Sequence, residues 1–273
     1  MLYGVSSAIE QDVTEFILSA AQTFKAIELV SEFPHVHYSV PNVSRLIELK
    51  SRFDLTYTMH APFSGVNLAG INPKLREASV NEMLYSIEYA KELDCELIVV
   101  HPGIISYPRN LQKFQRISKE NQRDSFIQIC EKAEEEKFLV CLENMPRVPP
   151  SFKQTWTGES LIEIVDELNS AFLQLALDVG HCNTTDIPIP QMIRDFGSRI
   201  KHVHIHDNDG CHETHSVVGQ GSVPWRAVIE ALRKERYHKL LIDEHRTIEG
   251  QKSGRVYLEQ IIQSCLQKTE NVT

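Results

Sequence analysis

Eight short apolar runs recur along the chain, and most of them are followed by a stretch with helical periodicity. The runs span residues 2–6, 25–30, 54–60, 96–101, 138–143, 173–178, 200–206 and 239–244. Amphipathic periods predict helices over residues 13–24, 72–93, 123–137, 159–171, 224–235 and 253–268. Strands that alternate with helices form parallel βαβ units, and eight such units in 273 residues are typical of a closed barrel. We therefore predict an α/β fold, a single-domain (β/α)8 TIM barrel over residues 1–273, with an open doubly wound sheet as the alternative.

Composition excludes several classes of protein. The chain has no run of about 18 apolar residues and no basic and then apolar N-terminal segment, so neither a membrane span nor a secretory signal is expected. The six cysteines are scattered without a CxxC pair, which is typical of reduced thiols in a cytoplasmic protein. A net charge of −9 argues against a generally basic surface for nucleic acids.

Side chains that can bind metals stand where the predicted strands end. Four runs end in His60, His101, Glu143 and Asp178, and a fifth ends at Glu244. The active site of such a barrel is built at the C-terminal ends of the strands and in the loops that follow them. We therefore expect these side chains to converge on one mouth of the barrel.

The alternation of side chains along a strand supports this convergence. In the seventh run, Val203 and Ile205 are expected to face the helices, while His202, His204 and His206 face the barrel axis. His202 is predicted to lie deeper as a structural polar residue. Buried carboxylates and imidazoles together cost several kcal/mol per ion unless they are neutralised, and a divalent cation does this. Nitrogen and carboxylate ligands without thiolate favour zinc, manganese, cobalt or iron(II) over calcium.

Short motifs in a fixed order resemble one superfamily over nearly the whole chain. They are MHAPF with VNLAG (59–70), VVHPG (99–103), CLEN (141–144), LDVGH (177–181), HVHIHDNDG (202–210), HSVVGQG (215–221) and DEH (243–245). The chain resembles the xylose isomerase-like TIM-barrel superfamily. That superfamily contains sugar phosphate isomerases and epimerases as well as the endonuclease IV group, known as AP endonuclease family 2.

The resemblance to the sugar enzymes implies a metal quartet of Glu143, Asp178, His204 and Glu244. In that branch Glu143 and Glu244 bind the metal and also exchange protons with the substrate, and His181 contacts the substrate. The resemblance to the endonuclease IV group implies further zinc ligands at His60, His101, His181, Glu213 and His215. Glu213 departs from that pattern, which usually has aspartate there. The implied cofactor is therefore a divalent metal ion, zinc or manganese, with one to three ions per chain.

Two enzyme functions follow, and the sugar branch is the one we favour. We expect a metal-dependent isomerase or epimerase of a small sugar, sugar phosphate or related polyol. Arg147 and Arg246 would anchor a phosphate, Phe63 would cover the sugar, and the relatives imply a homodimer. The alternative is an endonuclease IV-like zinc phosphodiesterase that acts on apurinic sites in DNA. The extra histidines favour it, but the segments 6–16, 31–42 and 144–156 lack the residues that such nucleases use on DNA. A metal-loaded barrel with a purely binding role is a third option.

Overall fold

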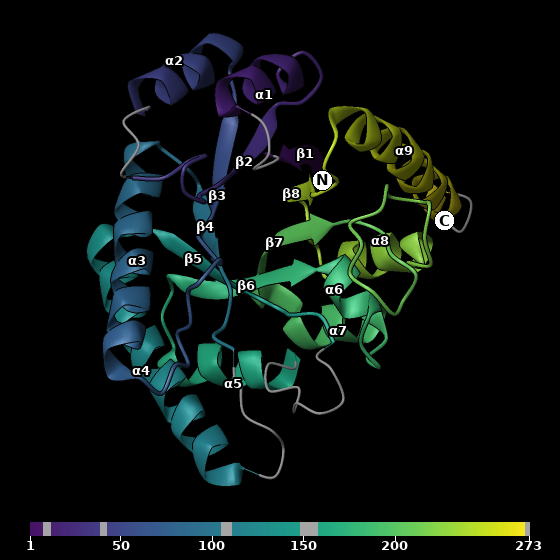
Figure 1. Cartoon of the computed structure of the whole chain (residues 1–273). Coiled ribbons are helices and arrows are strands. Elements are labelled where there is room, and N and C mark those ends of the chain that lie inside the picture. Colours follow the sequence, from purple (N-terminus) through teal and green to yellow (C-terminus); the bar gives the residue numbers. More distant parts are fainter. Residues whose placement is uncertain (8–11, 39–42, 105–110, 148–157, 271–273) are drawn as a thin grey trace.

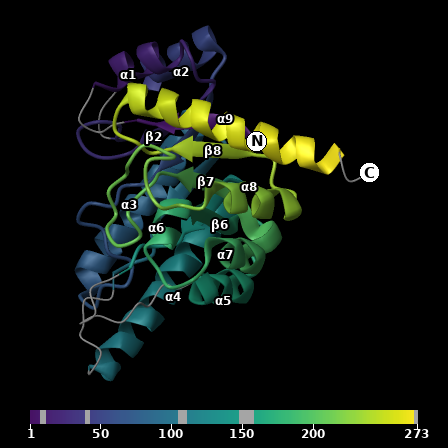
Figure 2. The ribbon, with the colours of Figure 1, turned by 90° about the vertical axis from the view of Figure 1, so that its right-hand side faces the viewer.

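The strands of the computed structural model form a closed ring in which every neighbouring pair is parallel and β8 pairs with β1. Helices surround this ring (Figures 1 and 2). The strands are β1 (Leu2–Ser6), β2 (Ala26–Val30), β3 (Thr56–His60), β4 (Leu97–Val100), β5 (Leu139–Glu143), β6 (Leu173–Asp178), β7 (Ile200–Ile205) and β8 (Leu240–Asp243). The closed ring confirms the predicted TIM barrel, and the open doubly wound sheet was the wrong alternative. Every predicted strand end lies within about two residues of the observed one.

The structure describes residues 1–7, 12–38, 43–104, 111–147 and 158–270, so parts of the three segments compared with DNA-binding nucleases fall outside it. The helices are α1 (Val13–Ala20), α2 (Val43–Phe53), α3 (Pro73–Glu92), α4 (Gln112–Glu136), α5 (Gly158–Leu168), α6 (Val179–Asn183), α7 (Ile189–Phe196), α8 (Trp225–Lys234) and α9 (Ile248–Glu270), with a 3-10 turn at Gly197–Arg199. Within these described residues, none of the helices combines the length and the apolar character that a membrane crossing needs.

Several helices differ from the sequence-based prediction for identifiable reasons. Helix α4 begins at Gln112, well before the predicted start at residue 123. The prediction missed its first turns because the side chains that they bury, Gln115, Ser118 and Gln122, are polar. A polar buried face carries no apolar periodicity. Helix α2 was not predicted and buries only Leu46 and Leu49. Helices α6 and α7 were also missed, because they span only five and eight residues. Helix α9 begins at residue 248, before the predicted start at residue 253.

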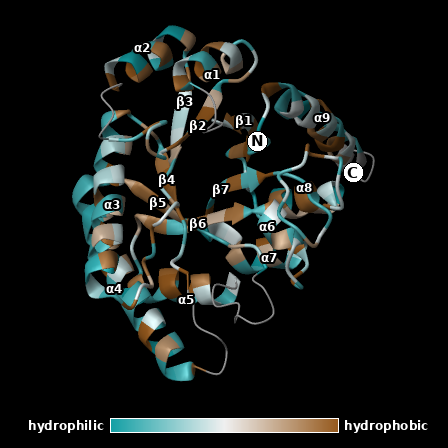
Figure 3. Ribbon diagram, in the orientation of Figure 1, coloured by the Kyte–Doolittle hydropathy of each residue, from teal (hydrophilic) through white to brown (hydrophobic). Residues whose placement is uncertain are grey.

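The main core lies between the strands and the surrounding helices. Outward-facing strand residues such as Ile27, Leu142 and Val203 belong to the same buried cluster as Phe16 of α1 and Trp225 of α8. Figure 3 shows the matching pattern in the helices, which carry both hydrophobic and hydrophilic stretches. The inward-facing residues form separate small apolar clusters inside the barrel. These clusters contain Leu97, Val99, Cys141 and Ala176, and Ala26, Leu240 and Ile242.

Strand register aligns the side chains that matter at the mouth. The pairing of β6 with β7 shifts after Leu175, so that Asp178 pairs with His204. Helix α6 begins directly after β6, and Asp178 is its N-cap, with a carboxylate oxygen that accepts the backbone N–H of His181 at 2.6 Å. The side-chain amide of Asn144 accepts the backbone N–H of Asp178 at 2.8 Å and donates to the carbonyl oxygen of Asp178 at 2.9 Å. The end of β6 is therefore rigidly placed.

Candidate metal centre

Glu143, Asp178, His204 and Glu244, here called the central quartet, meet at the C-terminal mouth of the barrel. The Nδ1 atom of His204 lies 2.8 Å from Glu143 Oε1 and 3.5 Å from Glu244 Oε1. Ligand atoms of Glu143, Asp178 and His204 all lie within 4.8 Å of one another. The structure thus brings together all four residues that the sequence assigned to one metal ion.

Two buried carboxylate oxygens test whether the quartet fits a cation. Asp178 Oδ2 is inaccessible to solvent and has no hydrogen-bond partner among the described residues. Glu143 Oε2 is equally buried, and its contacts with His101 and His60 are ion pairs that lack hydrogen-bond geometry. A buried charged oxygen without a partner is costly, and a coordinated cation removes that cost. Hard carboxylate oxygens and one imidazole nitrogen are the donors that manganese, iron(II), cobalt and zinc accept. The quartet therefore fits a divalent transition metal.

His60 and His101 form a second group with the other oxygen of Glu143. His101 Nε2 lies 2.8 Å and His60 Nε2 lies 3.4 Å from Glu143 Oε2, and the two Nε2 atoms are 3.1 Å apart. The Nδ1 atom of His60 is 2.8 Å from the carbonyl oxygen of Ala61. Because a carbonyl only accepts hydrogen bonds, Nδ1 carries the proton and the lone pair of Nε2 faces the mouth. Glu143 thus bridges this pair and the central quartet.

A third group lies beside Glu143 and Asp178 of the quartet and contains His181, Glu213 and His215. Glu213 Oε1 is 3.0 Å from the Nε2 atoms of both histidines, so this one carboxylate joins the two rings. His181 donates from Nδ1 to the carbonyl of Asn144 at 2.8 Å, which directs its Nε2 toward Glu213, whose carboxylate accepts from it. His206 joins this group, because its ring stacks on His215 with centroids 4.0 Å apart. Ligand atoms of the three histidines lie within 4.8 Å of one another.

The carboxylates and histidines of the quartet shift one another's pKa values strongly. Burial raises the pKa of Glu143, but the charges of His204 and His101 lower it further, to well below its usual range. Burial also raises the pKa of Asp178, and the charged histidines beside it lower the pKa to about 2. Burial holds the pKa of Glu244 well above its usual range, against the charge of His204. Burial lowers the pKa of His204, yet Glu244 and the other carboxylates around it raise it well above its usual range.

The three predicted substrate-binding residues lie at the rim of the mouth in different environments. The ring centroid of Phe63 lies 5.5 Å from that of His60 and 5.7 Å from that of His101. The Phe63 ring therefore packs against the second group. The guanidinium of Arg147 donates to the carbonyl of Thr184 at 2.6 Å and pairs with Asp186, which holds it on the neighbouring loop. Arg246 is exposed directly after β8. Phosphate binding by the two arginines stays a prediction.

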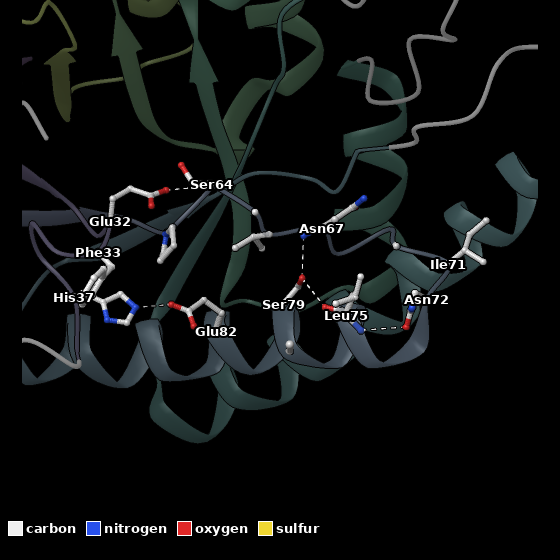
Figure 4. A pocket seen from close by; sticks show the side chains of 15 residues that line it. Glu32, Phe33, His37, Ser64, Asn67, Ile71, Asn72, Leu75, Ser79 and Glu82 are labelled. Carbon is white, nitrogen blue, oxygen red and sulfur yellow. Dashed lines mark hydrogen bonds and ion pairs between the residues drawn. The ribbon is translucent and has the colours of Figure 1, made fainter.

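A hollow of about 490 Å³ lies between α3 and the loop that carries Phe63 (Figure 4). At its edge, Glu32 accepts the backbone N–H groups of Phe63 at 2.7 Å and Ser64 at 2.8 Å. On the other side of the hollow, His37 contacts Glu82 of α3 at 2.7 Å. None of the residues that line the hollow belongs to the central quartet, and the hollow's contribution to the site is the anchor that Glu32 gives to the loop.

Three residues at the site were missed by sequence reasoning. His206 was placed on the axis side of β7 but left out of the site. Asn144 follows Glu143 in the CLEN motif and orients both Asp178 and His181. Glu28 stands in the middle of β2 rather than at its end, and it is fully buried beside His202 and His204. A charged residue on the inward parity of an apolar strand was the signal that would have found Glu28.

Comparison with known proteins places this site in a family. Residues 17–261 match the profile described as xylose isomerase-like TIM barrel. An uncharacterized protein of Methanocaldococcus jannaschii is 32% identical over 275 residues, covering 98% of this chain and 92% of that protein. A solved structure of a D-tagatose 3-epimerase-like protein superposes with a TM-score of 0.90 at 31% identity, covering 98% of this chain and 100% of that one. D-psicose 3-epimerase of Enterocloster bolteae is 31% identical over 94 residues, 34% of this chain and 30% of that protein. The chain belongs to the xylose isomerase-like TIM-barrel family, as the sequence motifs predicted.

Proposed function

We propose that the protein is a divalent-metal-dependent epimerase or isomerase of a small sugar, sugar phosphate or related polyol. The observation that carries this proposal is the central quartet, in which two buried carboxylates, a histidine and Glu244 converge and Asp178 Oδ2 has no hydrogen-bond partner among the described residues. The similarity to proteins described as sugar 3-epimerases supports the same class of substrate.

The residues at the mouth divide the work of such a reaction. Glu143, Asp178, His204 and Glu244 would hold the metal ion. A bound divalent cation would act as a Lewis acid and polarise the substrate carbonyl. Glu143 and Glu244, both in contact with His204 Nδ1, would remove a proton from one carbon and return one to the same or the neighbouring carbon. His181 would bind a substrate hydroxyl, and Phe63 would keep water from the reacting carbons.

Metal content and turnover together test the proposal. Elemental mass spectrometry of the untagged protein, prepared without chelator, is expected to find about one manganese, iron, cobalt or zinc ion per chain if the quartet alone is occupied. The metal-loaded protein is then assayed for interconversion of ketose epimers, starting with D-tagatose and D-psicose, and of aldose–ketose pairs. Glu143→Gln is expected to abolish turnover. Arg45→Gln, which changes an exposed residue of α2, is the control that should retain it. Full activity of Glu143→Gln, or a protein that binds no metal after reconstitution, would refute the proposal.

A second candidate function, zinc-dependent phosphodiester hydrolysis at apurinic sites, rests on a different observation. The second and third groups each bring at least three ligand-capable side chains within 4.8 Å, beside the quartet. Zinc at a stoichiometry of about three per chain would favour this function. Binding to an abasic duplex that weakens steeply with salt, together with cleavage of that duplex, would establish it. Absence of both at that stoichiometry would assign the extra histidines to substrate binding.

A further inference from the structure

Glu28 is a buried charge directly beneath the central quartet. It lies in the middle of β2, its side chain has no solvent exposure, and its three polar contacts all come from other inward-facing strand residues. Its Oε2 atom accepts from Thr58 Oγ1 of β3 at 3.0 Å and lies 2.8 Å from His202 Nε2 of β7. Its Oε1 atom lies 2.8 Å from His204 Nε2. Glu28 therefore contacts the one histidine of the quartet from behind.

The two ring nitrogens of His204 face opposite ways, one toward Glu28 and one toward the quartet. Its Nε2 lies 2.8 Å from Glu28 Oε1 as an ion pair, although neither atom forms a hydrogen bond of good geometry. When Nδ1 binds a cation the ring proton is on Nε2, where the neighbouring carboxylate can accept it. The other ring nitrogen, Nδ1, then points toward Glu143 and Glu244, at 2.8 and 3.5 Å. Metal ligands of this type commonly give their second N–H to a carboxylate, which sets both the tautomer and the ring orientation.

A purely space-filling role does not account for a carboxylate at this place. The barrel interior is already packed by apolar residues in the clusters around Val99 and Ile242. A buried carboxylate–imidazole pair costs several kcal/mol in desolvation, and an apolar replacement of similar volume is often neutral or stabilising. Thr58 and His202 are positioned on Glu28 itself, since both contact the oxygen that does not face His204.

We propose that Glu28 is a positioning residue that holds His204 with Nδ1 directed at the metal of the central quartet, and that Thr58 and His202 hold Glu28 in turn. The inference rests on the proposed metal centre and adds to it a residue that does not itself bind the ion. Glu28→Gln keeps the size of the side chain, but its amide group can donate as well as accept. An amide N–H turned toward His204 Nε2 would favour the tautomer in which Nδ1 is protonated and unavailable.

The experiment compares metal affinity and ligand geometry in the wild type, Glu28→Gln and a matched control. Glu82→Gln is the control, because it removes a carboxylate from a histidine pair of similar length, 2.7 Å, far from the quartet on α3. Affinity for Zn²⁺ and Co²⁺ is measured by competition with a chromophoric chelator, the visible spectrum of the Co²⁺ protein reports on its ligands, and urea unfolding in EDTA gives the stability of the metal-free chain.

Glu28→Gln is expected to weaken metal binding by about 10- to 100-fold and to change the Co²⁺ spectrum while the number of bound ions stays the same. Glu82→Gln is expected to change neither. Unchanged affinity and spectrum, with only the metal-free stability altered, would overturn the inference, and so would loss of one whole equivalent of metal, which would make Glu28 a ligand. If Glu28→Gln does not fold, Thr58→Val, which removes one hydrogen bond to Glu28, must show a smaller loss of affinity of the same kind. A wild type that binds no metal would instead refute the proposed function.

Discussion

Gly180 is the residue whose replacement most directly tests the packing of the third group. It lies in α6 between the N-cap Asp178 and His181. A Cβ atom at this position would lie 2.0 Å from Cε1 and 2.3 Å from Nε2 of His206, a separation that real Cβ contacts do not show. The ring of His206 is fully buried and stacked on His215 at 4.0 Å, so it has little room to retreat.

The expected effect of Gly180→Ala is the difference between two opposing contributions. Alanine in place of glycine favours a helix by about 0.5–1 kcal/mol. Overpacking a closed site costs about 1–3 kcal/mol, and a 2.0 Å overlap with a ring belongs to the upper part of that range. We therefore expect the free energy of unfolding to fall by about 1–2 kcal/mol. In the wild type, His206 Nε2 lies 3.3 Å from Asp178 Oδ1. Displacement of the His206 ring from this position should also weaken any metal binding by the third group.

The assay is urea unfolding in EDTA of four proteins: wild type, Gly180→Ala, His206→Ala and the double variant. If the clash is the cause, the added methyl group costs stability only when the ring is present. The double variant should then be at least as stable as His206→Ala, with a coupling energy equal to the full cost of the clash, about 2–3 kcal/mol. An equal cost in both backgrounds, or a Gly180→Ala protein as stable as the wild type, would refute this reasoning.

Three further predictions concern pH, a buried hydrogen bond and the metal. Burial raises the pKa of Asp243 to about 6, above the value of an unfolded chain, so its stabilising contribution is present at low pH and lost as pH rises through 6. The wild type should thus lose about 2 kcal/mol relative to Asp243→Asn between about pH 4.5 and 7.5 in EDTA; a constant difference in urea midpoints would contradict this. Trp225→Phe removes the 2.8 Å bond to the buried Asp207 carboxylate and should cost about 1.5–3 kcal/mol in the same assay, and no loss would show that the bond is dispensable. Removal of metal with EDTA should lower Tm, and an unchanged Tm would argue against a metal at the quartet. Return of the metal at 100 times its Kd should raise the free energy of unfolding by about 2.7 kcal/mol.

The sequence predicted the mouth of the barrel well because strand ends and side-chain alternation are local properties. His60, Glu143 and Asp178 each end an apolar run, and the period of two residues along a strand places His204 on the axis side. These features follow from the chain itself, without knowledge of which strands are neighbours. Because all the strands of a parallel barrel end at the same mouth, the side chains at these strand ends lie together there, whatever the details of the helices.

Features that depend on contacts between distant segments were not predictable in this way. The parity of β2 places the charged Glu28 inside the barrel, but its contact with His204 depends on β2 facing β7 across the barrel. The pairing of Glu213 with His181 depends on the path of the loop after β7. The early start of α4 was hidden because its buried face is polar, and amphipathic periodicity detects only apolar faces. Tertiary contacts decide all three.

The closed ring of strands also has a consequence for the order in which the chain matures on the ribosome. The central quartet takes its side chains from β5, β6, β7 and the residue after β8, and β8 must still pair with β1. A nascent chain that lacks its last strand holds three of the four ligands but not the ring that orients them. A cation bound by the quartet would therefore report on closure of the ring, and it would resist opening of the seam between the first and last strands.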